Sequence, residues 1–220
     1  MTHYVAIDIG GTNIKYGLID QEGQLVESHE MPTEAHKGGP HILQKTKDIV
    51  ASYLEKGPVA GVALTPSLYT EMLKNPRVIG VKNSSMPVQD IQTFVSLGGE
   101  DHIVFNGPDE QFLGGRLMGA KAGIGGTYGA MPELFLKLNE LIADKDLETA
   151  RELQYAINAI ISKLTAAHGN MYGVIKEVLK INEGLNIGSV RSPLTPVTEE
   201  DRPVVEAAAA LIRETKERFL

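Results

Sequence analysis

The chain has 220 residues, of which 42% are hydrophobic and 22% charged, and its formal net charge is −7 at pH 7. This composition excludes a disordered chain, and the absence of any basic run excludes the surface that nucleic acids and anionic membranes require. The sequence has no cysteine, hence no disulfide framework or thiolate metal site, and no stretch approaches the ~20 apolar residues of a membrane span. We therefore expect a cytoplasmic protein with no protein-bound metal, no nucleic-acid partner and no membrane partner.

Residues 1–64 predict the element order β-β-β-α-β. Apolar or alternating runs predict strands over residues 4–8, 13–20, 24–31 and 59–64, and apolar residues at helical spacing predict a helix over 41–55. Gln21–Gly23 predicts a hairpin turn between the second and third strands.

From Thr65 onward the pattern changes to alternating helices and strands. Helices are predicted over residues 66–74, 86–97, 110–118 and 132–143, and strands over 77–81, 102–105 and 122–128. Such alternation predicts a parallel sheet with right-handed crossovers. The remaining segments, 146–167, 171–183 and 199–219, are predicted to be helical.

Lys82 ends an apolar run and is followed by the small polar residues Asn83–Ser85. This pattern predicts a buried strand that delivers an amine to an enclosed pocket. A poorly solvated lysine loses proton affinity and becomes able to attack a carbonyl carbon. The alternative is a solvated lysine at the end of a strand, since buried lysines are rare.

Three segments at the ends of successive predicted strands carry a resemblance: Val78–Ser85, Phe105–Glu110 and Gly123–Gly129. Through them, residues 61–220 resemble the pyruvate-dependent class I aldolases of the N-acetylneuraminate lyase/dihydrodipicolinate synthase family, and most closely the lyase branch. The resemblance implies an α/β fold made of the last strands and C-terminal helices of a (β/α)₈ barrel. It also implies cleavage of N-acetylneuraminate to N-acetylmannosamine and pyruvate, with no cofactor other than the Schiff base to pyruvate.

The same resemblance implies a role for each matching residue. Lys82 is the Schiff-base lysine, whose iminium accepts electrons as the neighbouring C–C bond breaks. The implied substrate-binding residues are Ser84, Gly107, Asp109 and Glu110 at the sugar hydroxyls and Ile124, Gly125 and Gly126 at the pyruvate end. Two alternatives need no substrate: a helix N-terminus favours acidic residues, and the glycines can serve close helix packing.

The segment Asp8-Ile-Gly-Gly-Thr-Asn13 places two glycines between two strands. Glycines there let backbone N–H groups approach phosphate oxygens, although a tight turn also needs glycine. Residues 1–63 resemble the first phosphate-binding segment of ROK-family sugar kinases, in the actin/hexokinase-like superfamily. That resemblance implies a vestigial ATP phosphate site, with ATP and Mg²⁺ as cofactors only for a kinase; its residues are Asp8, Gly10, Gly11, Thr12 and Lys15.

The two resemblances meet at Gly61–Ala63, which predicts a chimera of two partial folds, residues 1–63 and 64–220. We expect one continuous mixed sheet, in which the order 3-2-1-4 of the first part is followed by the three later strands. The strand at 122–128 would then lie at an open edge, which favours a homo-oligomer.

Three functions follow. The first is a class I aldolase acting on a small sugar acid, impaired because the early barrel loops that bind the pyruvate carboxylate and supply the proton-relay tyrosine have no match here. The second is a catalytically silent hybrid. The third is a ROK-type sugar kinase fragment, which lacks a match to the catalytic Asn-Asp pair.

Overall fold

The computed structural model describes residues 3–9, 12–20, 24–56, 59–60, 64–192 and 194–220. The chain divides into two compact units: a first unit of residues 1–64 with 190–195, and a second unit of residues 65–189 with 196–220. Gly10, Gly11, the predicted turn at 21–23 and the junction Gly61–Ala63 lie outside the described residues.

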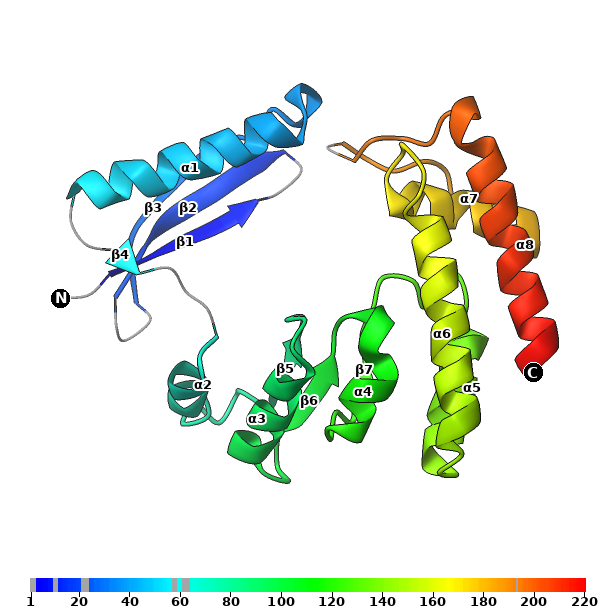
Figure 1. Cartoon of the computed structure of the whole chain (residues 1–220). Helices are drawn as coiled ribbons and strands as arrows, with labels where there is room; N and C mark the ends of the chain where they lie inside the picture. Colours follow the sequence, from blue (N-terminus) through cyan, green and yellow to red (C-terminus); the bar gives the residue numbers. More distant parts are fainter. Residues whose placement is uncertain (1–2, 10–11, 21–23, 57–58, 61–63, 193) are drawn as a thin grey trace. The chain divides into compact units, whose positions relative to one another are not determined.

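The first unit is a four-stranded sheet with a long helix over one face (Figure 1). Its elements are β1 (His3–Ile9), β2 (Asn13–Ile19), β3 (Leu25–Pro32), the 3₁₀ turn η1 (Ala35–Lys37), α1 (Gly39–Lys56) and β4 (Val59–Ala60). The strand order is β3-β2-β1-β4, as predicted. β2 pairs antiparallel with both β1 and β3, and β1 pairs parallel with β4. β3 and β4 are therefore parallel to each other, and α1 is the crossover that connects them.

The core of the first unit lies between the sheet and α1. Ile49 and Tyr53, four residues apart on α1, present one helical face to the buried Ile14 of β2. Strand register places Asp8 of β1 opposite Lys15 of β2. Because side chains alternate along a strand, Asp8 and Lys15 lie on the sheet face opposite Ile14.

The second unit begins with a three-stranded parallel sheet, in the order β5-β6-β7. Its elements are α2 (Pro66–Met72), β5 (Gly80–Asn83), α3 (Val88–Gly98), β6 (Ile103–Asn106), η2 (Asp109–Gln111), α4 (Phe112–Leu117) and β7 (Ala122–Gly123). Thr65 caps α2, since its hydroxyl accepts a hydrogen bond from the Leu68 N–H at 3.2 Å. The predicted alternation of helix and parallel strand is confirmed.

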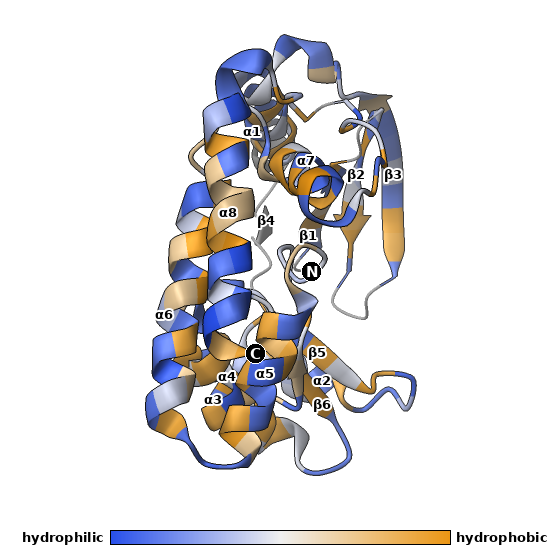
Figure 2. Cartoon of the chain, turned by 90° about the vertical axis from the view of Figure 1, so that its right-hand side faces the viewer, coloured by the Kyte–Doolittle hydropathy of each residue, from blue (hydrophilic) through white to orange (hydrophobic). Residues whose placement is uncertain are grey.

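Four further helices complete the second unit: α5 (Pro132–Ala143), α6 (Leu147–Leu164), α7 (Met171–Glu183) and, after the turn η3 (Glu199–Asp201), α8 (Arg202–Phe219). α6 packs against both α5 and α8, and α7 packs against α8. Hydrophilic and hydrophobic residues alternate along α6 and α8 in Figure 2, as expected for amphipathic helices. The apolar faces of α5, α6, α7 and α8 form one core that includes Leu138, Leu153, Ile157, Val178 and Ile212.

The buried Asp201 fixes the start of α8 against the loop between α6 and α7. Its carboxylate accepts hydrogen bonds from the backbone N–H groups of His168 (2.7 Å), Gly169 (3.2 Å) and Thr198 (3.0 Å). These bonds lower the pKa of Asp201, with the Thr198 bond contributing most. One carboxylate therefore joins two loops that are distant in the sequence.

The expectation of one continuous mixed sheet is wrong, because the described strands form two separate sheets. β4 has only two described residues and pairs with β1, while β5 pairs with β6. α2 with its flanking turns separates β4 from β5 in the sequence.

Several predicted elements are shorter than expected, two of them at the predicted site segments. The strand predicted over 122–128 ends at Gly123, because the following residues turn toward Asp109, to which Thr127 donates two hydrogen bonds. The helix predicted over 110–118 is a 3₁₀ turn followed by α4, which starts at Phe112.

Candidate active site

The C-terminal ends of β5, β6 and β7 meet at one edge of their sheet. Lys82 pairs in register with Phe105, and Phe105 pairs with Ala122. Backbone bonds continue past the strands: the Gly107 N–H donates to the Asn83 carbonyl oxygen at 2.8 Å, and the Ile124 N–H donates to the Asn106 carbonyl oxygen at 2.9 Å. The three predicted site segments are therefore neighbours.

Gly107 permits close approach between two of these segments. A Cβ atom at position 107 would lie 2.5 Å from Ser84 Oγ and 2.6 Å from the Asn83 carbonyl oxygen, distances that real Cβ atoms do not reach. Only glycine lets the turn after β6 lie against Ser84.

Asp109 is the most enclosed acidic residue of the candidate site, with 6% of its surface exposed. Its Oδ2 atom accepts hydrogen bonds from the Thr127 N–H (2.8 Å) and the Thr127 hydroxyl (2.6 Å). Its Oδ1 atom is buried without a partner among the described residues and fills the space where a side chain at Gly125 would begin. Burial raises the pKa of the Asp109 carboxyl, against the opposing effects of the Thr127 hydrogen bonds and the Lys82 charge.

A pocket of about 190 Å³ opens between these turns and the C-terminal helices. Of the residues predicted to bind substrate, Gly107, Asp109, Glu110 and Gly126 line this pocket. The remaining lining residues are Pro108, Thr127, Ile161, Thr165, Met171 and Tyr172. Ile161 lies on α6, Thr165 directly follows it, and Met171 and Tyr172 lie on α7. The resemblance to aldolase strand ends did not predict these four residues. Ile124 is about half exposed and is not among the lining residues.

Lys82 lies on β5 but is exposed, so the expectation of an enclosed amine is wrong for the described residues. Lys82 also does not line the pocket beside Asp109. The physical reason is that the second sheet has three strands, which cannot surround a side chain as a closed barrel does.

The predicted phosphate-binding residues lie in the first unit. Asp8 and Lys15 line one shallow depression of about 250 Å³ on the open face of the sheet. Thr12 follows the undescribed Gly10 and Gly11, and its carbonyl oxygen accepts a hydrogen bond from the Thr33 N–H at 2.8 Å. Asn13 donates to the Glu30 carboxylate.

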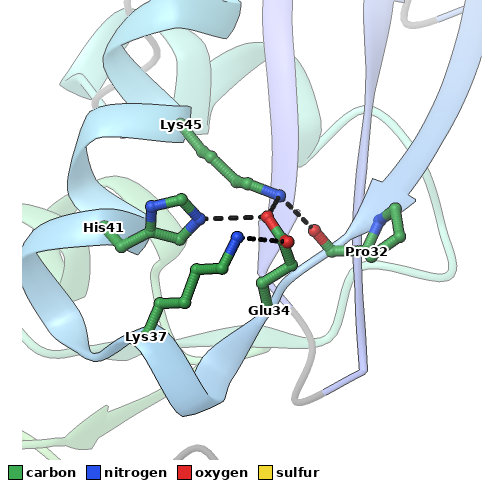
Figure 3. Close-up of polar contacts among 5 residues, drawn as sticks. All are labelled: Pro32, Glu34, Lys37, His41 and Lys45. Atoms are coloured by element: carbon green, nitrogen blue, oxygen red, sulfur yellow. Dashed lines mark hydrogen bonds and ion pairs between the residues drawn. The ribbon is translucent and has the colours of Figure 1, made fainter.

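Glu34, just after β3, lies at the centre of a cluster that sequence reasoning did not predict (Figure 3). Its carboxylate contacts the Nζ atoms of Lys37 and Lys45, each at 2.6 Å, and His41 Nε2 at 3.0 Å. Hydrogen bonds from Lys37, Lys45 and His41, in that order, hold the pKa of Glu34 well below its usual range. Glu34 also adopts a left-handed backbone (φ 51°), which these contacts stabilise.

Two features are absent from the residues that the structure describes. They contain no group of three or more His, Asp or Glu side chains that could hold a metal ion. None of the described helices is both long and apolar enough to cross a membrane.

The model of the dihydrodipicolinate synthetase family matches residues 54–212. The chain belongs to the dihydrodipicolinate synthetase family. The match includes β5, β6 and β7 with the turns that follow them, and leaves residues 1–53 outside.

Members of this family and their solved structures are similar to the chain over most of its length. An N-acetylneuraminate lyase of Mediterraneibacter gnavus is 60% identical over 162 residues, covering 74% of this chain and 51% of the relative. The structure of a "catalytic lysine mutant" of the Ruminococcus gnavus sialic acid aldolase superposes with a TM-score of 0.71 and 52% identity, covering 79% of this chain and 59% of that one.

One further relative matches a shorter part of the chain. An uncharacterised protein of Clostridium perfringens is 42% identical over 62 residues, covering 28% of this chain and 21% of the relative. The chain spans about half the length of the curated N-acetylneuraminate lyases that it matches.

Proposed function

We propose that the second unit is an aldolase of the N-acetylneuraminate lyase type, with Lys82 as the Schiff-base residue. The proposal rests on one observation above all: Lys82, the Asp109–Glu110 turn and the Gly125–Thr127 turn lie at one sheet edge, in a chain that is 60% identical to such a lyase over 162 residues. The substrate class is a small sugar acid with a 2-keto group, and no external cofactor is required.

In the proposed chemistry the neutral Lys82 amine adds to the C2 carbonyl carbon of the substrate. Loss of water then gives a protonated imine at C2, which accepts the electron pair of the C3–C4 bond as that bond breaks. The C4 hydroxyl gives its proton to a base or to water in the same step, and C4 becomes the aldehyde carbon of the sugar product. The products are an enamine on Lys82, hydrolysed to pyruvate and free lysine after protonation, and N-acetylmannosamine. Ser84, Gly107, Asp109 and Glu110 would contact the sugar hydroxyls, and Ile124, Gly125 and Gly126 would border the pyruvate end.

Borohydride reduction in the presence of labelled pyruvate tests the proposal. We expect a covalent adduct at Lys82 that the Lys82→Ala variant abolishes. Lys121→Ala is the matched control, because Lys121 is also exposed and lies just before β7. Release of N-acetylmannosamine from N-acetylneuraminate then separates a lyase from a reactive amine. An adduct that persists in Lys82→Ala contradicts the assignment.

A second candidate, a catalytically silent hybrid, is favoured by the exposure of Lys82. An exposed amine is not activated by desolvation. The silent hybrid predicts no adduct above that of Lys121, so the same reduction experiment decides between the two.

For residues 1–63 we propose an origin in a ROK-type kinase segment, which makes the chain a chimera. The support is the β3-β2-β1-β4 sheet with its crossover helix α1, and a family match that begins only at residue 54. Asp8, Gly10, Gly11, Thr12 and Lys15 would be the vestigial phosphate residues. A kinase activity would appear as ATP-dependent sugar phosphorylation that requires Mg²⁺.

We further propose a cytoplasmic homo-oligomer. The cysteine-free sequence fits a reducing compartment, and β7 pairs only with β6 among the described strands, which leaves an edge for another chain. Sedimentation of the purified protein tests the oligomeric state.

A further inference from the structure

Helix α6 carries two amide side chains, one turn apart, that face the turn after β6. Gln154 is buried (5% exposed) and lies on α6 between the fully buried Leu153 and Ile157. Its Oε1 atom accepts a hydrogen bond from the Leu113 N–H at 2.8 Å, and its Nε2 atom donates to the Asp109 carbonyl oxygen at 3.2 Å. Gln154 therefore binds the backbone at the first residue of η2 and again at Leu113 of α4, two residues after η2.

Asn158 binds the backbone of the next residue, Glu110. Its Nδ2 atom donates to the Glu110 carbonyl oxygen at 3.1 Å, and its Oδ1 atom accepts a hydrogen bond from Gln154 Nε2 at 2.8 Å. The two amides orient each other, and together they bind the backbone carbonyl groups of both Asp109 and Glu110.

The Asp109 side chain is held from another element, by the two hydrogen bonds from Thr127 after β7. The Asp109–Glu110 turn is thus fixed through its backbone by α6 and through a side chain by the turn after β7. It lines the 190 Å³ pocket in this fixed position.

A buried amide is costly unless its hydrogen bonds are made, so a leucine at position 154 would satisfy packing alone at lower cost. What leucine could not do is fix the position of two consecutive carbonyl groups. The chemistry of position 154 therefore fits a requirement on the turn better than a requirement on the core.

We propose that Gln154 and Asn158 are positioning residues, which set the place of Asp109 and Glu110 in the pocket and thereby govern affinity for the hydroxylated end of the substrate. The inference rests on the proposed function. We expect the two amides to affect binding of the sugar end of the substrate and not of pyruvate. Neither amide makes a hydrogen bond to β5 or to Lys82 among the described residues.

The test measures the initial rate of borohydride-trapped adduct at Lys82 against the concentration of pyruvate and, separately, of N-acetylneuraminate. In Asn158→Ala we expect the half-saturating concentration of N-acetylneuraminate to rise about tenfold, the effect of one lost hydrogen bond, with pyruvate within about twofold of wild type. Gln154→Leu should act in the same direction. Asn158 is only partly buried, so its truncation keeps the test valid if Gln154→Leu does not fold.

Gln92→Leu is the matched control, because Gln92 also donates to a side chain one turn along its own helix, Ser96 Oγ at 2.7 Å, but touches no site turn through that bond. It should leave both substrates unchanged. Equal losses for pyruvate and N-acetylneuraminate would show a purely structural role and overturn the proposal, as would an unchanged N-acetylneuraminate curve. A wild-type chain that forms no Lys82 adduct rejects the proposed function together with this inference.

Discussion

The two units of the chain are stabilised by different means. Among the described residues, the second unit has one core of twenty buried hydrophobic side chains, whereas the core of the first unit has three. Hydrophobic burial is the main favourable term in folding, so the first unit depends more on individual polar contacts, such as those of Glu34. The candidate aldolase site therefore lies on the unit whose described residues form the larger hydrophobic core.

Truncation of a core leucine gives the largest expected effect. Leu153→Ala on α6 should lower the free energy of unfolding of the second unit by about 2–5 kcal/mol, because it leaves a cavity among fully buried neighbours. Urea unfolding followed by helical circular dichroism measures it. Leu136→Ala on α5, which removes an exposed leucine, should cost far less. Equal costs at the two positions would contradict the assignment of the core.

A methyl group at Gly107 tests the packing of the site itself. Gly107→Ala should cost about 1–3 kcal/mol, because the added carbon overlaps Ser84 Oγ and the Asn83 backbone. Gly129→Ala is the control, since no atom lies within 4 Å of its added carbon. The same urea titrations compare the two variants. A Gly107→Ala protein as stable as wild type would show that the turn after β6 does not lie against Ser84.

The buried carboxyl of Asp109 predicts a smaller, pH-dependent effect. Burial raises its pKa in the folded state, so the acid form is favoured and stability falls as pH rises from its unfolded pKa, near 3.8, through the folded value. Asp109→Asn removes this dependence while keeping an acceptor for Thr127. Unfolding at pH 4 and pH 8 should therefore differ less in Asp109→Asn than in wild type. An unchanged difference would mean that Asp109 is not the titrating group.

Glu34 gives the corresponding test in the first unit, with the opposite sign. Its pKa is lowered in the folded state, so its contacts stabilise above the ordinary value of 4.5 and are lost as pH falls through the folded value. Glu34→Gln should raise the acid midpoint at which β1–β3 lose hydrogen-exchange protection. Glu71→Gln removes a single exposed pair with Lys74 and should leave that midpoint unchanged. If both variants behave alike, the cluster contributes nothing beyond an ordinary surface pair.

Helices with clear end signals could be predicted from the sequence. Those over 132–143 and 171–183 match the structure residue for residue. Pro132 opens the first; the Asn170 side chain caps the second and Gly184, with φ 69°, ends it. These signals are local, which is why they suffice. The parallel β5-β6-β7 arrangement also followed from the alternation of helices and strands, whereas the order of the first sheet followed from the resemblance of residues 1–63 to ROK-family kinases.

What failed depends on distant contacts. Whether two strands distant in the sequence pair, and whether Lys82 is enclosed, is decided by contacts that no local pattern records. Part of the site left a weak signal: Gln154 falls in the same helical register as the buried Ile157 and Ile161, an amide on an apolar face. Thr127 gave no such signal, because its role arises only when the turn after β7 meets Asp109.

Positions 109 and 125 share a single volume, since the Asp109 Oδ1 atom lies where any side chain at Gly125 would start. A side chain at position 125 therefore needs a shorter side chain than aspartate at position 109. We expect the residues at 109 and 125 to covary among homologues. A double variant with a larger residue at 125 and a smaller one at 109 should be more stable than the single variant at 125.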